Sequence, residues 1–178
     1  MSVMTADFAT LTHHYVLHDG TRVLMRVLRP DDARYYPEFI AHLTLEDLRL
    51  RFFAPVRHFS HAFLARLTQL DYARAMAFVA LDEASGEPIG VVRLHADSNY
   101  EQAEYAVLVR SDLKGRGIGW MLMELMIRYG RSENLRRIEG QVLQENTSML
   151  DMCREIGFEI SEDPSDCTVK LVRLELRP

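Results

Sequence analysis

Alternating glycines between a predicted strand and a predicted helix are the clearest chemical signal in this chain. Strand formers end in the run Glu104–Arg110, and after a short turn comes the run Lys114, Gly115, Arg116, Gly117, Ile118 and Gly119. Backbone N–H groups converging in such a loop, with the positive end of the following helix, bind a phosphate or pyrophosphate. The alternative is a tight turn that needs glycine only for its positive φ.

The glycine spacing excludes two known phosphate loops. A Walker loop places Lys and then Ser or Thr directly after its last glycine, whereas Trp120 follows Gly119 here. A Rossmann fingerprint has glycines at its first, third and sixth positions, and the glycines of this loop alternate instead. The loop therefore points to a different class of anion site.

Composition limits the classes of function that remain. The chain has 178 residues, 48% of them hydrophobic, which suits one globular domain with a full core. A net charge of −5 argues against nucleic acid as a partner. Two cysteines without CxxC spacing and a lone HxxH pair at His58 and His61 predict neither a disulfide scaffold nor a metal site. No run approaches the roughly 20 apolar residues of a membrane span, and no signal pattern is visible, so we expect a cytoplasmic protein.

The elements that position the loop follow from periodicity and turn residues. Residues 1–20 are expected to form a partly ordered leader before a single domain over residues 21–178. Strands are expected over residues 22–28, 75–81, 89–94, 102–110, 138–143 and 168–175. Helices are expected over residues 33–42, with Asp31 and Asp32 as N-cap, over 45–52 and 60–70, after the glycine loop, and over 146–156. This order predicts an α/β (α+β) fold with a mixed, mostly antiparallel sheet of about 6–7 strands and helices on both faces.

Three motifs in this order resemble those of the GCN5-related N-acetyltransferase (GNAT) superfamily. The run Lys114–Gly119 resembles its acetyl-CoA loop, usually Q/R-x-x-G-x-G/A, with Lys in place of the usual Gln or Arg. Asn146–Phe158 resembles the superfamily's Asn-led helix that ends in Gly-Phe. Arg26–Asp32 resembles its first strand and the R-P-x-D motif at which the chain leaves that strand. The resemblance covers about residues 22–176.

Other segments resemble one branch of this superfamily more closely. Leu43–Phe53, Phe59–Phe63 and Ala103–Val109 are similar to the acetyltransferase domain of bacterial Pat-type protein lysine acetyltransferases. The resemblance implies acetylation of a protein lysine by acetyl-CoA, with acyl-CoA synthetase-type enzymes as the expected target class. Arg49, Arg51, Phe52 and Phe53 then either shape the acceptor groove or merely end an amphipathic helix.

The resemblance also implies where the cofactor lies. The strand over residues 103–110 splays from the strand over residues 138–143, and the pantetheine arm bonds to the backbone of Val107, Leu108 and Val109. Lys114 and Arg116 would supplement the backbone at the pyrophosphate, although they could be ordinary solvated charges. Asn146 would contact the cofactor, although an N-cap alone would explain it.

The same resemblance assigns catalytic roles. An acceptor lysine must lose a proton before it attacks the thioester directly, and Glu104 is expected to be the general base. A solvated carboxylate at a strand end is the alternative for Glu104, and Glu101 is a competing acid. Cys153 occupies a position where many members have a tyrosine that assists the leaving thiolate. We expect a small buried residue beside the thioester, and the alternative of an acyl-carrying nucleophile lacks an adjacent base.

Two other functions share these features. A member of the same superfamily that acetylates a small amine would have the same loop and fold with a narrower acceptor pocket. A sensor that binds acyl-CoA without catalysis would not need Glu104. A transfer assay with labelled acetyl-CoA distinguishes these three functions.

Overall fold

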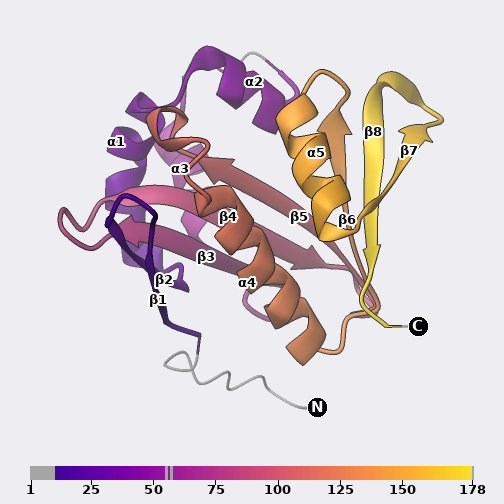
Figure 1. The fold of residues 1–178 in the computed structure, drawn as a ribbon, viewed down its shortest axis with the longest axis horizontal. Coiled ribbons are helices and arrows are strands. Elements are labelled where there is room, and N and C mark those ends of the chain that lie inside the picture. The colour runs from indigo at the N-terminus through magenta and orange to yellow at the C-terminus, as the bar shows by residue number, and fades with distance from the viewer. Residues whose placement is uncertain (1–10, 55, 57, 178) are drawn as a thin grey trace.

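The computed structural model describes residues 11–54, 56 and 58–177. In this part of the chain eight strands form one sheet in the order β1-β2-β3-β4-β5-β6-β8-β7, shown in Figure 1. Every neighbouring pair is antiparallel except β5 and β6. The strands are β1 (His13–Val16), β2 (Arg22–Val27), β3 (Ala75–Asp82), β4 (Pro88–Ala96), β5 (Gln102–Val109), β6 (Arg137–Leu143), β7 (Glu159–Asp163) and β8 (Asp166–Glu175). The predicted mixed, mostly antiparallel sheet is confirmed.

The expected strand number was too low because two edge strands were missed. β1 lies inside the segment expected to be a leader, and β7 follows Phe158 directly. Both strands are short and polar, and they lie at the two outer edges of the sheet, where little apolar surface is buried. Such strands carry a weak hydrophobic signal. The first ten residues of the expected leader lie outside the described residues.

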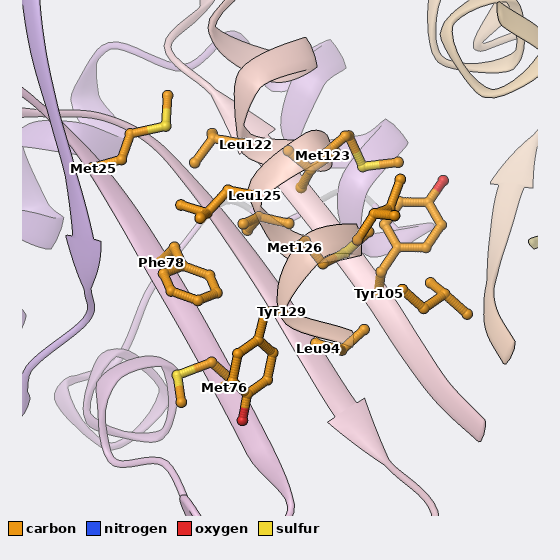
Figure 2. Packing of buried hydrophobic residues seen from close by; sticks show 14 of the residues in the cluster. Met25, Met76, Phe78, Leu94, Tyr105, Leu122, Met123, Leu125, Met126 and Tyr129 are labelled. Atoms are coloured by element: carbon orange, nitrogen blue, oxygen red, sulfur yellow. The ribbon is translucent and has the colours of Figure 1, made fainter. Parts of the chain in front are cut away.

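Helices cover both faces of the sheet, as predicted (Figure 1). The α-helices are α1 (Tyr36–Ala41), α2 (Leu45–Phe52), α3 (His61–Thr68), α4 (Ile118–Ser132) and α5 (Thr147–Ile156). Alternating residues of β3 distinguish the two faces, since Phe78 packs with Tyr129 of α4 whereas Val79 belongs to the cluster of Tyr36 of α1 and Leu64 of α3. Figure 2 shows α4 laid on the strands, with Leu125 and Tyr129 beside Phe78.

The first helical segment differs from its prediction. A 3₁₀ helix, η1 (Pro30–Tyr35), precedes α1, and the residue at its N-cap is Arg29. Asp32 is buried instead of capping from outside the helix. Its carboxylate accepts hydrogen bonds from the Arg29 backbone N–H at 2.7 Å and from both terminal nitrogens of Arg26 at 2.8 Å. This buried ion pair fixes the chain where it leaves β2.

β5 and β6 part after a short stretch of parallel pairing, as the predicted splay requires. Their register ends with Glu104 opposite Glu139. At the next position the Tyr105 ring lies against Gly140, where an added Cβ would stand 2.5 Å from the ring carbon Cε1. The ring therefore fills the space that a tighter pairing of the two strands would need. None of the helices in the described part of the chain is long and apolar enough to cross a membrane.

Candidate active site

A cavity of about 870 Å³ opens where β5 and β6 diverge. Its walls come from α2, from β5 and β6, from the glycine loop with the start of α4, and from α5. A volume of this size suits a ligand of several hundred daltons. Most of the predicted site residues line it: Glu104, Val107, Leu108, Val109, Lys114, Gly115, Gly117, Ile118, Gly119 and Asn146. Arg116 and Cys153 are the two predicted residues that do not line it.

The glycine loop leaves the N-terminus of α4 open. Gly115 has φ +75° and Gly117, the N-cap, has φ +88°, and both lie in the left-handed region that favours glycine. No side chain caps α4. By contrast, α2, α3 and α5 are capped by Thr44, Ser60 and Asn146. The first N–H groups of α4 are therefore available to a ligand, and the helix dipole favours an anion there.

The two cations of the loop already have carboxylate partners. The Lys114 ammonium contacts Asp47 of α2, whose other oxygen accepts a hydrogen bond from the Ser111 hydroxyl. Arg116 pairs with Asp19 and turns away from the cavity. Burial alone would raise the pKa of Asp47, but the hydrogen bonds that its carboxylate accepts from Lys114 and Ser111 hold this pKa below its usual range. Backbone N–H groups are thus the uncommitted donors of the loop, and a contribution of Lys114 or Arg116 to cofactor binding stays a prediction.

The strand edge next to the loop is free on one side. On β5, Val107, Leu108 and Val109 pair with β4 residues, and the β5–β6 register does not extend to them. Gln141 and Val142 of β6 line the opposite wall of the gap. An extended ligand can therefore bond to the β5 backbone as an added strand would.

Glu104 lies at the point of divergence. It is exposed and lines the cavity. In the described part of the chain no hydrogen bond or ion pair engages its carboxylate, whereas Asp47 and Asp151, which also line the cavity, pair with Lys114 and Arg154. The competing acid Glu101 does not line the cavity. Glu104 thus presents an uncommitted carboxylate to the cavity.

Cys153 is fully buried beneath the cavity floor. Its Sγ lies 3.2 Å from the hydroxyl of Tyr105, which does line the cavity and also contacts Met149 Sδ at 3.8 Å. Burial raises the pKa of the Cys153 thiol, so the protonated form dominates at neutral pH. Figure 2 places Tyr105 at the margin of the core cluster. Sequence reasoning missed Tyr105 because an aromatic residue in an apolar strand indicates only core packing.

Asn146 has the N-cap role that the sequence offered, and its contact with the cofactor stays a prediction. Its side chain accepts a hydrogen bond from the Met149 backbone N–H at 3.3 Å, so it is the N-cap of α5. It also lines the cavity. Among the α2 residues expected at the acceptor groove, Arg51, Phe52 and Phe53 line the cavity, whereas Arg49 pairs with Glu46 and Glu145 outside it.

The described residues contain no group of three or more His, Cys, Asp or Glu placed to hold a metal ion. The site consists instead of an open helix N-terminus, a free strand edge and the uncommitted Glu104 carboxylate. Glu155 also lines the cavity without a hydrogen bond or ion pair in the described part of the chain, but it lies on α5 and not at the point where β5 leaves β6. These features fit a long ligand with a pyrophosphate at the helix end and an extended arm along β5.

The chain is similar to known acetyltransferases. The acetyltransferase (GNAT) family model matches residues 41–158. An acetyltransferase of Pseudomonas aeruginosa is 35% identical over 167 residues, which are 92% of this chain and 90% of that protein. The acetyltransferase Pat of Mycolicibacterium smegmatis is 32% identical over 139 residues, which are 78% of this chain but only 41% of that protein.

A solved structure agrees over nearly the whole chain. The GNAT domain of S. lividans PAT matches with a TM-score of 0.86 and 26% identity, covering 94% of this chain and 98% of that one. Acetyl-CoA is the acetyl donor of this family, and the features of the cavity fit it. The chain is therefore an acetyltransferase that belongs to the GNAT family.

Proposed function

We propose that this enzyme acetylates a lysine side chain of a protein, with acyl-CoA synthetase-type enzymes as the target class and Glu104 as the general base. The observation that carries the proposal is the uncommitted Glu104 carboxylate, which lines the cavity where β5 leaves β6. The extensive likeness to the GNAT domain of S. lividans PAT and the resemblance to Pat-type enzymes favour a protein acceptor.

The acceptor amine needs a base at neutral pH. A lysine with a pKa of about 10.4 is neutral in only about one molecule in 2,500 at pH 7, a deficit of about 4.6 kcal/mol. Because no hydrogen bond or ion pair engages the Glu104 carboxylate in the described part of the chain, it can take up that proton directly or through a water molecule. Glu104 therefore makes the amine nucleophilic where the cavity opens.

The donor side needs less assistance. Acetyl-CoA, when bound, supplies the acetyl group as a thioester, and an ordinary thiol with a pKa of about 8.5 leaves as thiolate without a strong acid. The proposal assigns the cofactor to the backbone N–H groups of the loop over residues 114–119 and to the β5 edge at Val107–Val109. Cys153 lies below this path, and a thiol with a raised pKa is a poor nucleophile.

Replacing Cys153 with Ala is expected to retain most transferase activity. The substitution removes the contact with the Tyr105 hydroxyl and leaves a small cavity, so we expect a lower melting temperature, with a stability loss of about 1–2 kcal/mol. Initial rates with saturating acetyl-CoA and thermal melts of the same preparation measure the two effects. A loss of activity beyond about 10²-fold in a folded variant, or an acetyl group trapped on Cys153, would assign it a chemical role.

The acceptor class is tested with labelled acetyl-CoA. The acceptors are a purified acyl-CoA synthetase, a lysine peptide, and two small amines, a polyamine and a free amino acid, at equal amine concentration. Label on a lysine Nζ of the synthetase, located by mass spectrometry and absent with Glu104→Gln, supports the proposal. Transfer only to a small amine contradicts the protein acceptor, and binding of acetyl-CoA without transfer to any acceptor indicates a sensor.

A further inference from the structure

Arg51 stands out among the residues that line the acceptor side of the cavity. It lies in the last turn of α2, the helix that packs through Leu48 onto the β4–β5 face beside Val91 and Leu108. It is partly buried and lines the same cavity as Glu104. The two groups are close enough for Glu104 to raise the pKa of Arg51 by its charge. Arg51 therefore lies in the same cavity as Glu104 and within range of its charge.

The Arg51 guanidinium has no anionic hydrogen-bond partner among the residues that the structure describes. Its guanidinium carbon lies 4.7 Å from the centroid of the Phe52 ring. Arg49 and Arg110, by contrast, are paired with carboxylates, Arg49 with Glu46 and Glu145 and Arg110 with Asp112. Partly burying a cation without a hydrogen-bonded anion costs free energy, so a positive charge kept at a cavity wall calls for a ligand that supplies the anion.

A second guanidinium adds to the positive potential. Arg93 of β4 donates from Nη2 to the Leu67 carbonyl oxygen at 2.7 Å and to the Arg66 carbonyl oxygen at 3.3 Å, so its partners are neutral. Burial lowers the pKa of Arg51 to about 10, Arg93 acts in the same direction, and Glu104 opposes both. Arg51 thus interacts with one further cation, Arg93, and with one carboxylate, Glu104, so these three charges sum to a positive charge.

We propose that Arg51 binds a carboxylate that the acceptor carries beside its amine. The inference builds on the proposed function, since it needs the acceptor amine at Glu104. An amine that arrives as a cation is repelled by the two guanidiniums unless its own molecule brings a compensating anion. Once bound, the same positive charges favour the neutral amine, which is the form that reacts. The carboxylate can belong to an acidic residue next to a lysine or to a free amino acid.

The test compares matched acceptors that differ only in charge. One peptide has an acceptor lysine flanked by Asp or Glu, and its pair has Asn or Gln at the same positions. An amino acid and its amide form a second pair. Wild-type enzyme is expected to prefer the carboxylate member of at least one pair by about 10- to 100-fold in kcat/KM, the range of a hydrogen bond to a charged group.

Variants locate the preference at Arg51. In Arg51→Met, which keeps an apolar stem on Phe52, the preference is expected to fall to about 2-fold or less, and in Arg51→Lys part of it is expected to remain. Arg49→Gln removes a charge from the same helix outside the cavity and is expected to keep the full preference. Thermal melts and acetyl-CoA binding check that each variant is folded.

The outcomes separate the inference from the proposed function. Equal rates with charged and neutral acceptors in the wild type, or an Arg51→Met variant that slows both members of a pair equally, overturns the role of Arg51 while lysine acetylation stands. An Arg51-dependent preference confined to the free amino acid supports the carboxylate site and contradicts the protein acceptor. An Arg51-dependent preference confined to the peptides supports both the carboxylate site and the protein acceptor.

Discussion

Glu104→Gln is expected to lower kcat by about 10²–10⁴-fold with a lysine peptide at pH 7, the range for removal of a general base. Glutamine keeps the shape and hydrogen-bonding reach of the side chain but cannot accept the proton. Acetyl-CoA affinity is expected to stay nearly unchanged, because Glu104 is separate from the open α4 N-terminus and precedes the free β5 edge. Steady-state kinetics and calorimetric titration with acetyl-CoA measure the two quantities on one preparation.

Raising the pH is expected to reduce the defect of Glu104→Gln. About one lysine in nine is already neutral at pH 9.5, against about one in 2,500 at pH 7, so a base matters less there. Glu139→Gln is the matched control, since Glu139 is the register partner of Glu104 on β6 and does not line the cavity. Full activity of Glu104→Gln at pH 7 would place the base elsewhere. An equal loss at both pH values would mean that Glu104 positions the acceptor without taking its proton.

The sequence predicted the parts of the site whose signals are local. The glycine loop, the Asn146 cap and the strand that carries Glu104 each depend on residues within a few positions of one another, and the structure brings them to one cavity. The 3₁₀ helix before α1 was missed because the Asp32 carboxylate is bound by Arg26 of the preceding strand. That competition for one side chain depends on tertiary contacts and leaves no periodic pattern.

Contacts between distant segments could not be predicted from this sequence. The splay of β5 from β6 was expected only from a family resemblance, and the contact found where it begins, the Tyr105 ring against the bare Cα of Gly140, joins residues far apart in sequence. The partners of the loop cations, Asp47 for Lys114 and Asp19 for Arg116, are equally remote in sequence. Charge at a loop therefore indicates little about a ligand until its protein partners are known.

The ion pairs of Lys114 and Arg116 leave the backbone, already expected to be the main source of anion affinity, with less support from these two side chains. With Lys114 and Arg116 engaged, the glycine conformations that aim N–H groups into the cavity become the sensitive feature. The Lys114–Asp47 contact also ties the loop to α2, the helix that presents Arg51. The glycine loop and Arg51 are thus both attached to α2, the loop through the Lys114–Asp47 ion pair.

Gly117→Val is expected to abolish the thermal stabilisation that acetyl-CoA gives the wild type. Saturation at about 100 times Kd contributes about 2.7 kcal/mol, or about 5–10 °C in Tm for a chain of this size. Valine resists the left-handed φ of +88° at this N-cap, so the loop must change conformation and the N–H groups at the start of α4 lose their shared direction. The variant is expected to fold, because no atom lies within 4 Å of the added Cβ. Melting curves with and without acetyl-CoA give the measurement.

Gly86→Val separates loss of the site from ordinary backbone strain. Gly86 has φ +74°, also has no atom within 4 Å of an added Cβ, and lies in the β3–β4 turn outside the cavity. Both variants should therefore melt earlier than the wild type by similar amounts. Only Gly86→Val should still gain stability from acetyl-CoA. If Gly117→Val gains as much as the wild type does, the open N-terminus of α4 is not where the pyrophosphate binds.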